Sequence, residues 1–183
     1  MKKLFLVLLV LALAGTSAFA VDLMSFPPSV RPGNVFINAG VGFSTAPLAG
    51  ASMVIPPLVA SFDVALPVEV PISVGGLVGF YRWERFTTFP IIHGETLTFV
   101  TFGGRANWHW NIDIEWLNLY TGIFLGWTHF MWESSNPLMP SPSLGGIAIG
   151  GQLGARFFFA QNVGLVIETG FPFVAMAGLT FRF

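Results

Sequence analysis

The sequence contains no cysteine, and charged residues make up only 9% of its 183 positions. Without cysteine, the chain can form neither a disulfide bond nor a lipid-modified N-terminal cysteine. A typical soluble domain is about 25% charged, so this composition cannot cover a water-exposed surface. Both lysines lie at positions 2 and 3, which leaves residues 21–183 with six arginines against nine acidic residues, a formal net charge of −3. An acidic chain without a basic patch also argues against nucleic-acid binding.

A membrane-spanning helix is missing after the first twenty residues. Residues 1–20 have the pattern of a secretory signal peptide, with Lys2 and Lys3, an apolar core and a small-x-small ending. We therefore expect residues 21–183 to form one exported domain. Its most apolar stretch, residues 163–181, contains Glu168, Pro172 and three glycines, whereas a spanning helix needs about 20 mainly apolar residues. Hydrocarbon otherwise accepts only a closed β-barrel.

Alternation of apolar and polar or small residues is the dominant pattern of the chain. In one segment Val100, Phe102 and Trp108 share one phase, and Thr101 and Arg105 share the other. This period of two predicts β-strands, and segments of about 9–11 residues can cross a bilayer. The sequence predicts an all-β fold, an eight-stranded antiparallel up-and-down transmembrane β-barrel. The predicted strands are residues 34–44, 58–66, 72–83, 96–110, 116–127 (or as far as 132), 145–159, 163–171 and 174–183.

The connections between these segments alternate in length. Those after the second, fourth and sixth segments are short, and those after the first, third and fifth are long. Outer-membrane barrels have short periplasmic turns and long outer loops. We therefore expect both termini in the periplasm, and we expect residues 84–95 and 133–143 to form surface loops.

The six tryptophans suggest two aromatic girdles at the membrane–water interfaces, where indole rings are enriched. The periplasmic girdle would contain Trp108, Trp110 and Trp116, and the outer girdle Trp83, Trp127 and Trp132. The alternative is that these are scattered core aromatics.

Charged residues inside the strands share the inward phase. They are Asp63, Arg105, Arg156, Glu168 and Arg182. An arginine facing lipid at the bilayer midplane costs about 2–4 kcal/mol, so these groups should face the lumen and pair there. We expect Arg182 to pair with Glu168 or Asp63. The functional alternative is a binding or catalytic carboxylate site.

The interior of an eight-stranded barrel is only just wide enough for its side chains. Large inward residues such as Phe36, Tyr81 and Phe124 therefore argue against a wide pore, although inward glycines leave room for a narrow conduit.

Catalytic and metal-binding patterns are weak. The three histidines are dispersed and no cysteine assists them, so we expect no metal site and no cofactor. His129, Glu133 and Ser134 or Ser135 lie near one another in sequence, and a His–Ser–acid triad could form there. The His-x-Ser-Asn motif of outer-membrane lipid A deacylases is absent, however, so we do not expect an enzyme.

The signal peptide, the eight strands and the final Phe181-Arg182-Phe183 together resemble the small outer-membrane barrels of the OmpA, OmpX and OmpW type. The resemblance covers essentially all of residues 21–183. It implies an outer-membrane location in a diderm bacterium, with outer-membrane lipid, periplasmic chaperones and the barrel assembly machinery as partners. In those barrels the last strand is an assembly signal, which corresponds here to Ala177, Leu179, Phe181 and Phe183.

Four functional hypotheses remain from the sequence. The favoured one is an integral outer-membrane barrel with an envelope-structural or surface-interaction role and an unknown surface ligand. The second, implied by the resemblance to OmpW, is a narrow passive channel for small or hydrophobic solutes. The third is a lipid-modifying enzyme that depends on His129. The fourth is a soluble periplasmic barrel like a lipocalin, but neither face of the strands supplies the charges that its surface would need.

Overall fold

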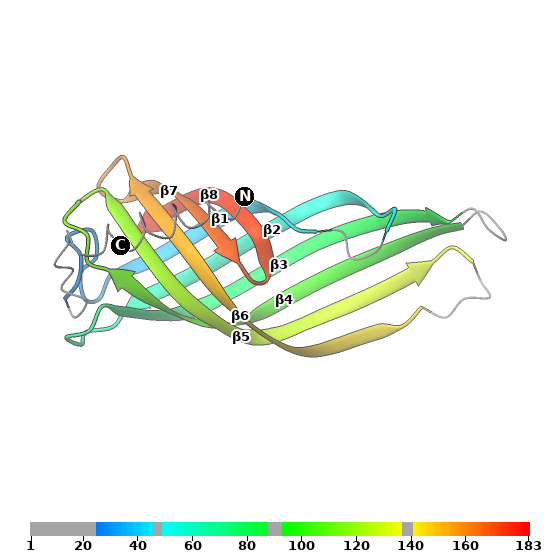
Figure 1. Ribbon diagram of the computed structural model, residues 1–183, viewed down its shortest axis with the longest axis horizontal. Coiled ribbons are helices and arrows are strands. Elements are labelled where there is room, and N and C mark those ends of the chain that lie inside the picture. Colours follow the sequence, from blue (N-terminus) through cyan, green and yellow to red (C-terminus); the bar gives the residue numbers. More distant parts are fainter. Residues whose placement is uncertain (1–24, 46–48, 88–92, 137–140) are drawn as a thin grey trace, which may run out of the picture.

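We describe a computed structural model that covers residues 25–45, 49–87, 93–136 and 141–183. In this part of the chain, eight antiparallel strands pair in sequence order, and β8 pairs with β1 to close a barrel (Figure 1). The strands are β1 (Val35–Phe43), β2 (Ser52–Ala65), β3 (Ile72–Thr87), β4 (His93–Trp110), β5 (Leu117–Ser134), β6 (Ser143–Phe158), β7 (Val163–Gly170) and β8 (Phe173–Arg182). The predicted all-β antiparallel barrel is confirmed. The predicted signal peptide lies outside the described residues.

No helix within the described ranges is long and apolar enough to cross a membrane.

Four strands are longer than the alternation indicated. β2 begins at Ser52 and includes Pro56 and Pro57, where its register with β3 is irregular. β3 and β4 pair as far as Thr87 and His93, so much of the predicted loop 84–95 is strand. β5 likewise continues to Ser134. In these strand ends the apolar residues face inward, whereas in the barrel they face outward. A search for strands with apolar residues in the outward phase therefore assigned these ends to polar loops.

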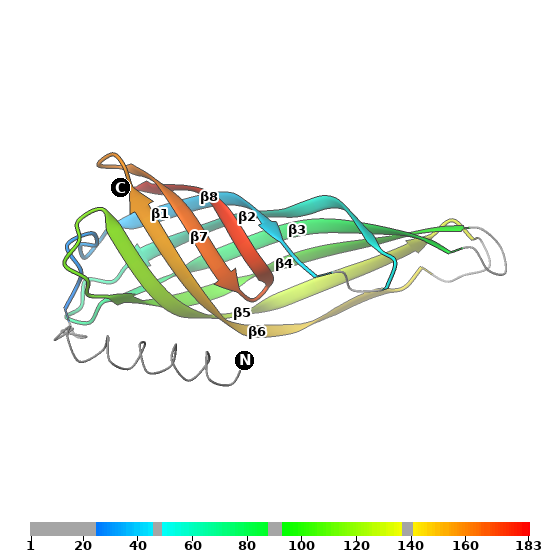
Figure 2. The same ribbon diagram turned by 45° about the horizontal axis from the view of Figure 1, so that its top comes forward.

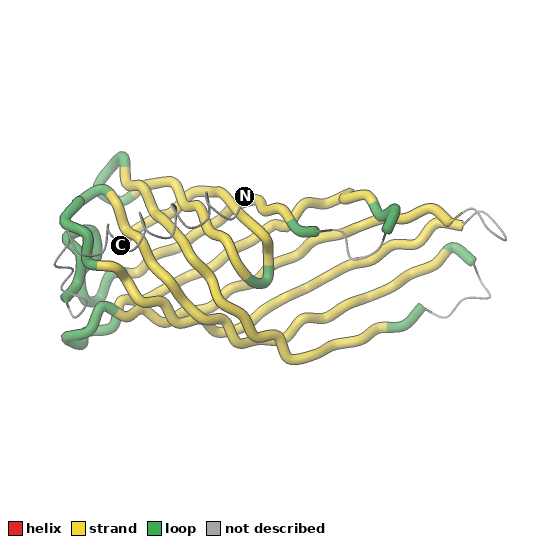
Figure 3. The backbone as a smooth tube through the Cα atoms, viewed as in Figure 1, coloured by secondary structure: helices red, strands yellow, loops and turns green. Residues whose placement is uncertain are grey.

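The barrel is much taller on one side than on the other. β1, β7 and β8 have 8–10 residues, whereas β3 to β6 have 16–18. Figures 1 and 2 both show β2 to β6 projecting well beyond the β7–β8 turn. We call this projection the five-strand extension. It consists of residues 52–57, 81–87, 93–99, 130–134 and 143–150. The opposite end of the barrel carries the short turns (Figure 3).

The polarity of the strands reverses between the barrel and the five-strand extension. In the barrel, each strand exposes apolar side chains outward, such as Ile37, Phe62, Val78, Phe102, Ile123, Leu153, Ile167 and Leu179. In β3, β4 and β5 of the extension, most outward positions hold polar side chains, which include Arg82, Glu84, Thr96, Thr98 and Glu133, while Phe86 and Met131 are apolar exceptions. The inward positions there hold Tyr81, Trp83, Leu97, Phe99, Phe130 and Trp132. The outer surface is therefore apolar around the barrel and mainly polar on β3 to β5 of the extension, whereas Ile147 and Ile149 of β6 remain exposed there.

Two glycines permit the closure of the barrel. Gly40 of β1 lies opposite Gly178 of β8. A Cβ atom on Gly178 would lie 2.1 Å from the carbonyl oxygen of Ala39, and one on Gly40 would lie 2.5 Å from that of Ala177. A side chain at either position would push the two strands apart, because neither backbone oxygen can move without breaking the ladder.

We predict that Gly178→Ala lowers the free energy of unfolding by about 1–3 kcal/mol, the usual cost of overpacking. Urea unfolding of the protein folded in detergent micelles measures this. The matched control is Gly146→Ala, because a Cβ atom at Gly146 meets no atom within 4 Å. Equal stability of the two variants would contradict the tight seam.

Candidate functional site

The lumen of the barrel is filled by three layers of side chains. The layer at the short-turn end is apolar and contains Val30, Phe36, Ala65 and Phe158, with Phe26 packed against it. The middle layer is polar. The layer toward the five-strand extension is apolar again, and its buried members include Val59, Leu77, Tyr81, Phe124, Val166, Phe173 and Met176. The inward orientation predicted for Phe36, Tyr81 and Phe124 is confirmed, since all three are buried.

Asp63 on β2 is the centre of the polar layer. Its Oδ1 accepts hydrogen bonds from Arg105 Nε at 2.7 Å and from Asn107 Nδ2 at 2.9 Å. Its Oδ2 accepts from Arg156 Nη2 at 2.5 Å and also from Arg105 Nη2. The side chains of Asp63, Arg105 and Arg156 are fully buried. One carboxylate therefore binds two guanidinium groups from two different strands.

Glu168 on β7 supplies the second negative charge. Its Oε1 accepts from Arg105 Nη1 at 2.9 Å and from the Tyr120 hydroxyl. Two carboxylates and two arginines make the formal charge of this network zero. Buried ions of this kind are tolerated only with good geometry and additional hydrogen bonds, and both conditions are met here.

Arg156 is held by aromatic rings as well as by charge. Its guanidinium lies 4.4 Å from the ring centroid of Phe36 and 4.2 Å from that of Tyr120. It also donates at 3.2 Å to the side-chain oxygens of Asn38 and Asn118. Cation–π contact is strongest where water is excluded, so this layer holds Arg156 in one orientation.

Further polar residues complete the layer, and sequence reasoning did not select them. His109 lies between Ser73 Oγ at 2.9 Å and Asn118 Oδ1 at 3.2 Å. Gln152 Nε2 donates to Asn107 Oδ1 at 2.5 Å. All these residues occupy inward positions of their strands, and the strand phase read from the sequence already places them there.

Arg182 does not join this network. It donates through Nε to the carbonyl oxygen of Gln161 at 3.1 Å and through Nη1 to that of Ser29 at 2.7 Å. Its guanidinium also lies 4.2 Å from the ring centroid of Phe158. The expected pairing with Glu168 or Asp63 is therefore wrong, because Arg182 lies at the end of β8 and Glu168 lies farther up the lumen.

The tryptophans divide by strand phase. Trp110, Trp116 and Trp127 have exposed side chains, and Trp108 lies in the outward phase. Trp83 is buried with Leu97 in the upper apolar layer, and Trp132 packs against Phe130 with ring centroids 6.5 Å apart. The assignment of Trp83 and Trp132 to an outer girdle is therefore wrong. They face inward because the extension reverses the polarity of its strands.

The residues of the candidate His–Ser–acid triad, which the sequence left as an alternative, are not brought together. His129 Nε2 lies 2.9 Å from Ser143 Oγ, whereas Ser135 Oγ accepts from the backbone N–H of Gly94 at 2.9 Å. Ser134 Oγ accepts from the backbone N–H of Asn136 at 3.2 Å. Within the described ranges, no group of three or more His, Cys, Asp and Glu side chains could hold a metal ion.

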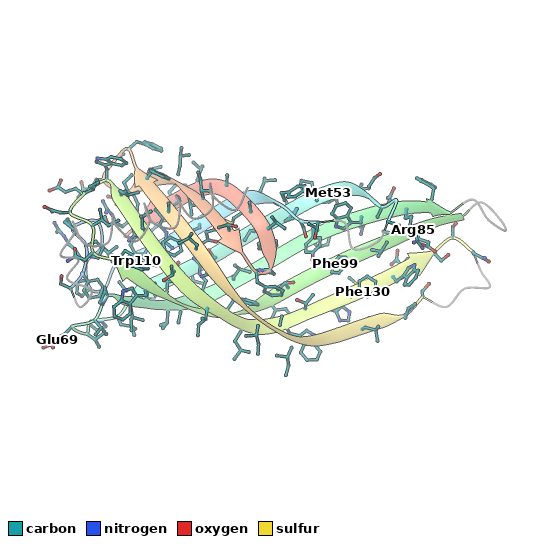
Figure 4. The ribbon with its side chains drawn as sticks, viewed as in Figure 1. Met53, Glu69, Arg85, Phe99, Trp110 and Phe130 are labelled. Carbon is teal, nitrogen blue, oxygen red and sulfur yellow. The ribbon has the colours of Figure 1, made fainter. Side chains whose placement is uncertain are left out.

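A lateral groove opens between β6 and the β7–β8 turn. Its volume is about 450 Å³. Aromatic rings of Tyr81, Phe99, Phe130 and Phe171 line it, together with the inner side of β6. Figure 4 shows Phe99 and Phe130 on neighbouring strands of the tall side. The hydroxyls of Thr101 and Thr128, 2.9 Å apart, provide its polar spot.

The closed strand order and the filled lumen define the class of fold, that of the small eight-stranded outer-membrane β-barrels. No protein-family model and no curated protein matches the sequence. The structure is similar to that of Ail, the attachment invasion locus protein of Yersinia pestis, in complex with the heparin analogue sucrose octasulfate. The TM-score is 0.58 at 14% identity, over 84% of this chain and 100% of that chain. It is also similar to the outer membrane protein OprG from Pseudomonas aeruginosa, with a TM-score of 0.59 at 9% identity over 86% and 99% of the two chains. At these identities the likeness concerns the fold.

We predict that Asp63→Asn destabilises the barrel by about 3–5 kcal/mol, because it leaves two buried arginines with one carboxylate between them. The free energy of unfolding in urea measures the loss. Glu69→Gln serves as the control, because Glu69 is exposed in the β2–β3 turn and should change stability by no more than about 0.5 kcal/mol. An Asp63→Asn variant as stable as the control would show that the ion pairs contribute nothing.

Proposed function

We propose that the chain is an integral outer-membrane protein with a surface-interaction role, and that the five-strand extension is the part that makes contact. The reversal of strand polarity is the observation that carries this proposal. Apolar residues cover the outside of the barrel, as lipid requires. Polar residues such as Arg82, Glu84 and Glu133 cover the extension, as water requires. A barrel immersed in lipid over its whole height would keep its outward face apolar throughout.

The same reversal supports an orientation of the barrel in the outer membrane. We place the extension outside the cell and the short turns in the periplasm, together with both termini, after export directed by residues 1–20. Trp110 and Trp116 are exposed near the short-turn end, and Trp127 is exposed just below the reversal. Exposed indoles at these two levels fit two membrane–water interfaces.

The outward face of β8 also keeps its proposed role. Leu179 and Phe183 are exposed, and Ala177 and Phe181 share their phase. We assign these four side chains to contact with outer-membrane lipid and to recognition by the barrel assembly machinery after escort by periplasmic chaperones.

A passive route for small hydrophobic solutes is the second candidate, and the aromatic groove is the observation that favours it. The groove leads inward to Phe124 and Leu77, both buried, and the ion-paired layer lies beyond them. Water and ions would have to displace the Arg105 and Arg156 ion pairs to pass. We therefore favour a contact role over transport.

Neither an enzymatic role nor polyanion binding is part of this proposal. The hydroxyl that bonds to His129 is that of Ser143, which is not one of the candidate triad residues. The structure of Ail contains a heparin analogue, but the outward face of this extension sets Arg82 against Glu84 and Glu133. Such a face lacks the basic cluster that a sulfated ligand needs.

We predict that intact cells displaying this protein adhere to extracellular proteins, and that shortening β3 to β6 of the extension abolishes this adherence. The variant replaces residues 82–98 and 131–143 each by an Asn-Gly turn, which joins strand positions that already pair, Tyr81 with Phe99 and Phe130 with Leu144. Adherence to a panel of immobilised extracellular proteins is measured beside heat-modifiable gel mobility, which reports the folded barrel. Undiminished adherence with equal folded protein would refute the contact role.

We further predict no step conductance from the pure protein in planar bilayers, because the three lumen layers leave no continuous aqueous path. A matched control is the empty bilayer with the same detergent. Reproducible conductance steps would favour the channel hypothesis instead.

A further inference from the structure

A polar pocket lies at the short-turn end of the barrel, far from the five-strand extension. The segment before β1, the β6–β7 turn and the end of β8 form its walls, and Figures 1 and 2 show the end of β8 at this end of the barrel. The volume of the pocket is about 450 Å³, whereas a water molecule occupies about 30 Å³ in the liquid. This rim pocket, whose charged members are Arg31, Glu115 and Arg182, therefore has room for a small organic group.

The two arginines of the rim pocket have no carboxylate partner. Arg182 directs three of its five N–H donors to main-chain carbonyl oxygens, two of them to Gln161 and one to Ser29. The bond to Ser29 holds the segment that carries Arg31 against the end of β8. In the described part of the chain, neither arginine forms an ion pair, whereas the buried arginines of the lumen do.

The wall of the rim pocket also has hydrogen-bonding capacity that the described residues do not use. The hydroxyl group of Ser29 is buried and has no partner among them, although buried polar groups are normally paired. Arg182 has two further N–H donors beyond the three that bind carbonyl oxygens. The main-chain oxygen of Phe183 accepts instead from Val35 N–H at 2.9 Å and from Asn34 Nδ2 at 3.1 Å. A group with several acceptor oxygens would supply what the arginines lack.

The rim pocket also displays a negative charge. Glu115, in the β4–β5 turn, lines the same space and forms no ion pair with either arginine. A ligand with negative charge alone would be repelled by this carboxylate, whereas a ligand that carries both signs matches both walls. Two guanidinium groups from separate segments favour phosphate as the anionic group, because its oxygens point in several directions and a carboxylate is planar.

Exposed aromatic side chains place the rim pocket at the depth of lipid headgroups. Trp116 follows Glu115 directly and is 54% exposed, and Phe183 at the pocket is 64% exposed. Aromatic rings of this kind are enriched at the membrane–water interface, and basic pockets at that depth bind phosphate-bearing headgroups. In the orientation proposed above, this interface belongs to the inner leaflet of the outer membrane.

We propose that the rim pocket binds the headgroup of a phosphatidylethanolamine molecule of the inner leaflet. The phosphate accepts hydrogen bonds from Arg31 and Arg182, the primary ammonium group donates to Glu115, and the acyl chains lie along the lipid-exposed side of β8. This inference goes beyond the surface role and rests on the proposed orientation, which puts the short turns at the periplasmic face.

Native mass spectrometry of the purified protein in a nonionic detergent tests the proposal. Phosphatidylethanolamine, phosphatidylglycerol and phosphatidylcholine with the same acyl chains are added in equal amounts, and phosphatidylethanolamine should be the lipid that is retained. Phosphatidylglycerol has no cation, and the quaternary ammonium of phosphatidylcholine cannot donate a hydrogen bond to Glu115. Arg31→Gln should lower the retained lipid about tenfold, as the loss of a charge-assisted hydrogen bond predicts.

Glu115→Gln should bind phosphatidylethanolamine and phosphatidylglycerol equally. The matched control is Asp113→Asn, because Asp113 is exposed in the same turn and does not line the rim pocket; it should keep the preference of the unmodified protein. Arg31 and Glu115 are exposed, so these variants should fold, and heat-modifiable gel mobility checks this. Unchanged lipid retention in Arg31→Gln, or an unchanged preference in Glu115→Gln, would overturn the proposal.

Water-soluble competitors distinguish the source of the bound group. Glycerophosphoethanolamine, which is the headgroup without acyl chains, should displace the lipid, whereas equal concentrations of inorganic phosphate or alanine should not. Displacement by phosphate alone would remove the role of Glu115, and displacement by alanine alone would indicate a site for free amino acids; either result would overturn the proposal. If shortening the extension abolishes adherence while the protein shows no lipid preference, the surface role stands and the lipid site fails.

Discussion

The whole structure depends on the requirement that main-chain N–H and C=O groups be paired wherever water is absent. Closure of the barrel meets this requirement for all eight strands, and the seam at Gly40 and Gly178 is where the ring closes. Closure at eight strands in turn fixes a narrow interior that side chains must fill. The polar groups of that interior then need partners among themselves. Strand number, glycine placement and the composition of the lumen are therefore consequences of one constraint.

The polar layer shows how such an interior can carry charge. Asp63 and Glu168 balance Arg105 and Arg156. Asp63, Glu168 and Arg156 each have hydrogen-bond partners beyond their counter-ions, and Arg105 binds both carboxylates. Buried ion pairs of this kind do not by themselves make a protein more stable than an apolar core would. The ions instead make the residues of the layer depend on one another, because the loss of any one of them leaves a buried charge uncompensated. Because apolar layers cover the network on both sides, water cannot compensate for a missing partner.

Strand phase could be predicted from sequence, and position along the strand could not. Alternation identified the strands and placed Asp63, Arg105, Arg156 and Glu168 in the lumen, where the structure brings them together. It also placed Arg182 in the same phase, but phase does not say how far up the barrel a residue lies. Trp83 and Trp132 were misassigned for a second reason. Their strands keep the period of two and exchange the polarity of their faces, so the rule that apolar residues face outward fails in the extension.

The short β7–β8 hairpin is the origin of both features that distinguish this barrel. The hairpin turns at Gly170, so in the described part of the chain the segment of β6 from Ser143 to Gly150 has no strand partner on that side. A longer hairpin would pair the β6 edge and cover the aromatic groove together, so the edge and the groove exist for the same reason. On the other flank, where β1 is also short, two prolines protect β2. The two flanks of the extension therefore differ, because prolines remove main-chain donors from β2 and none does so in β6.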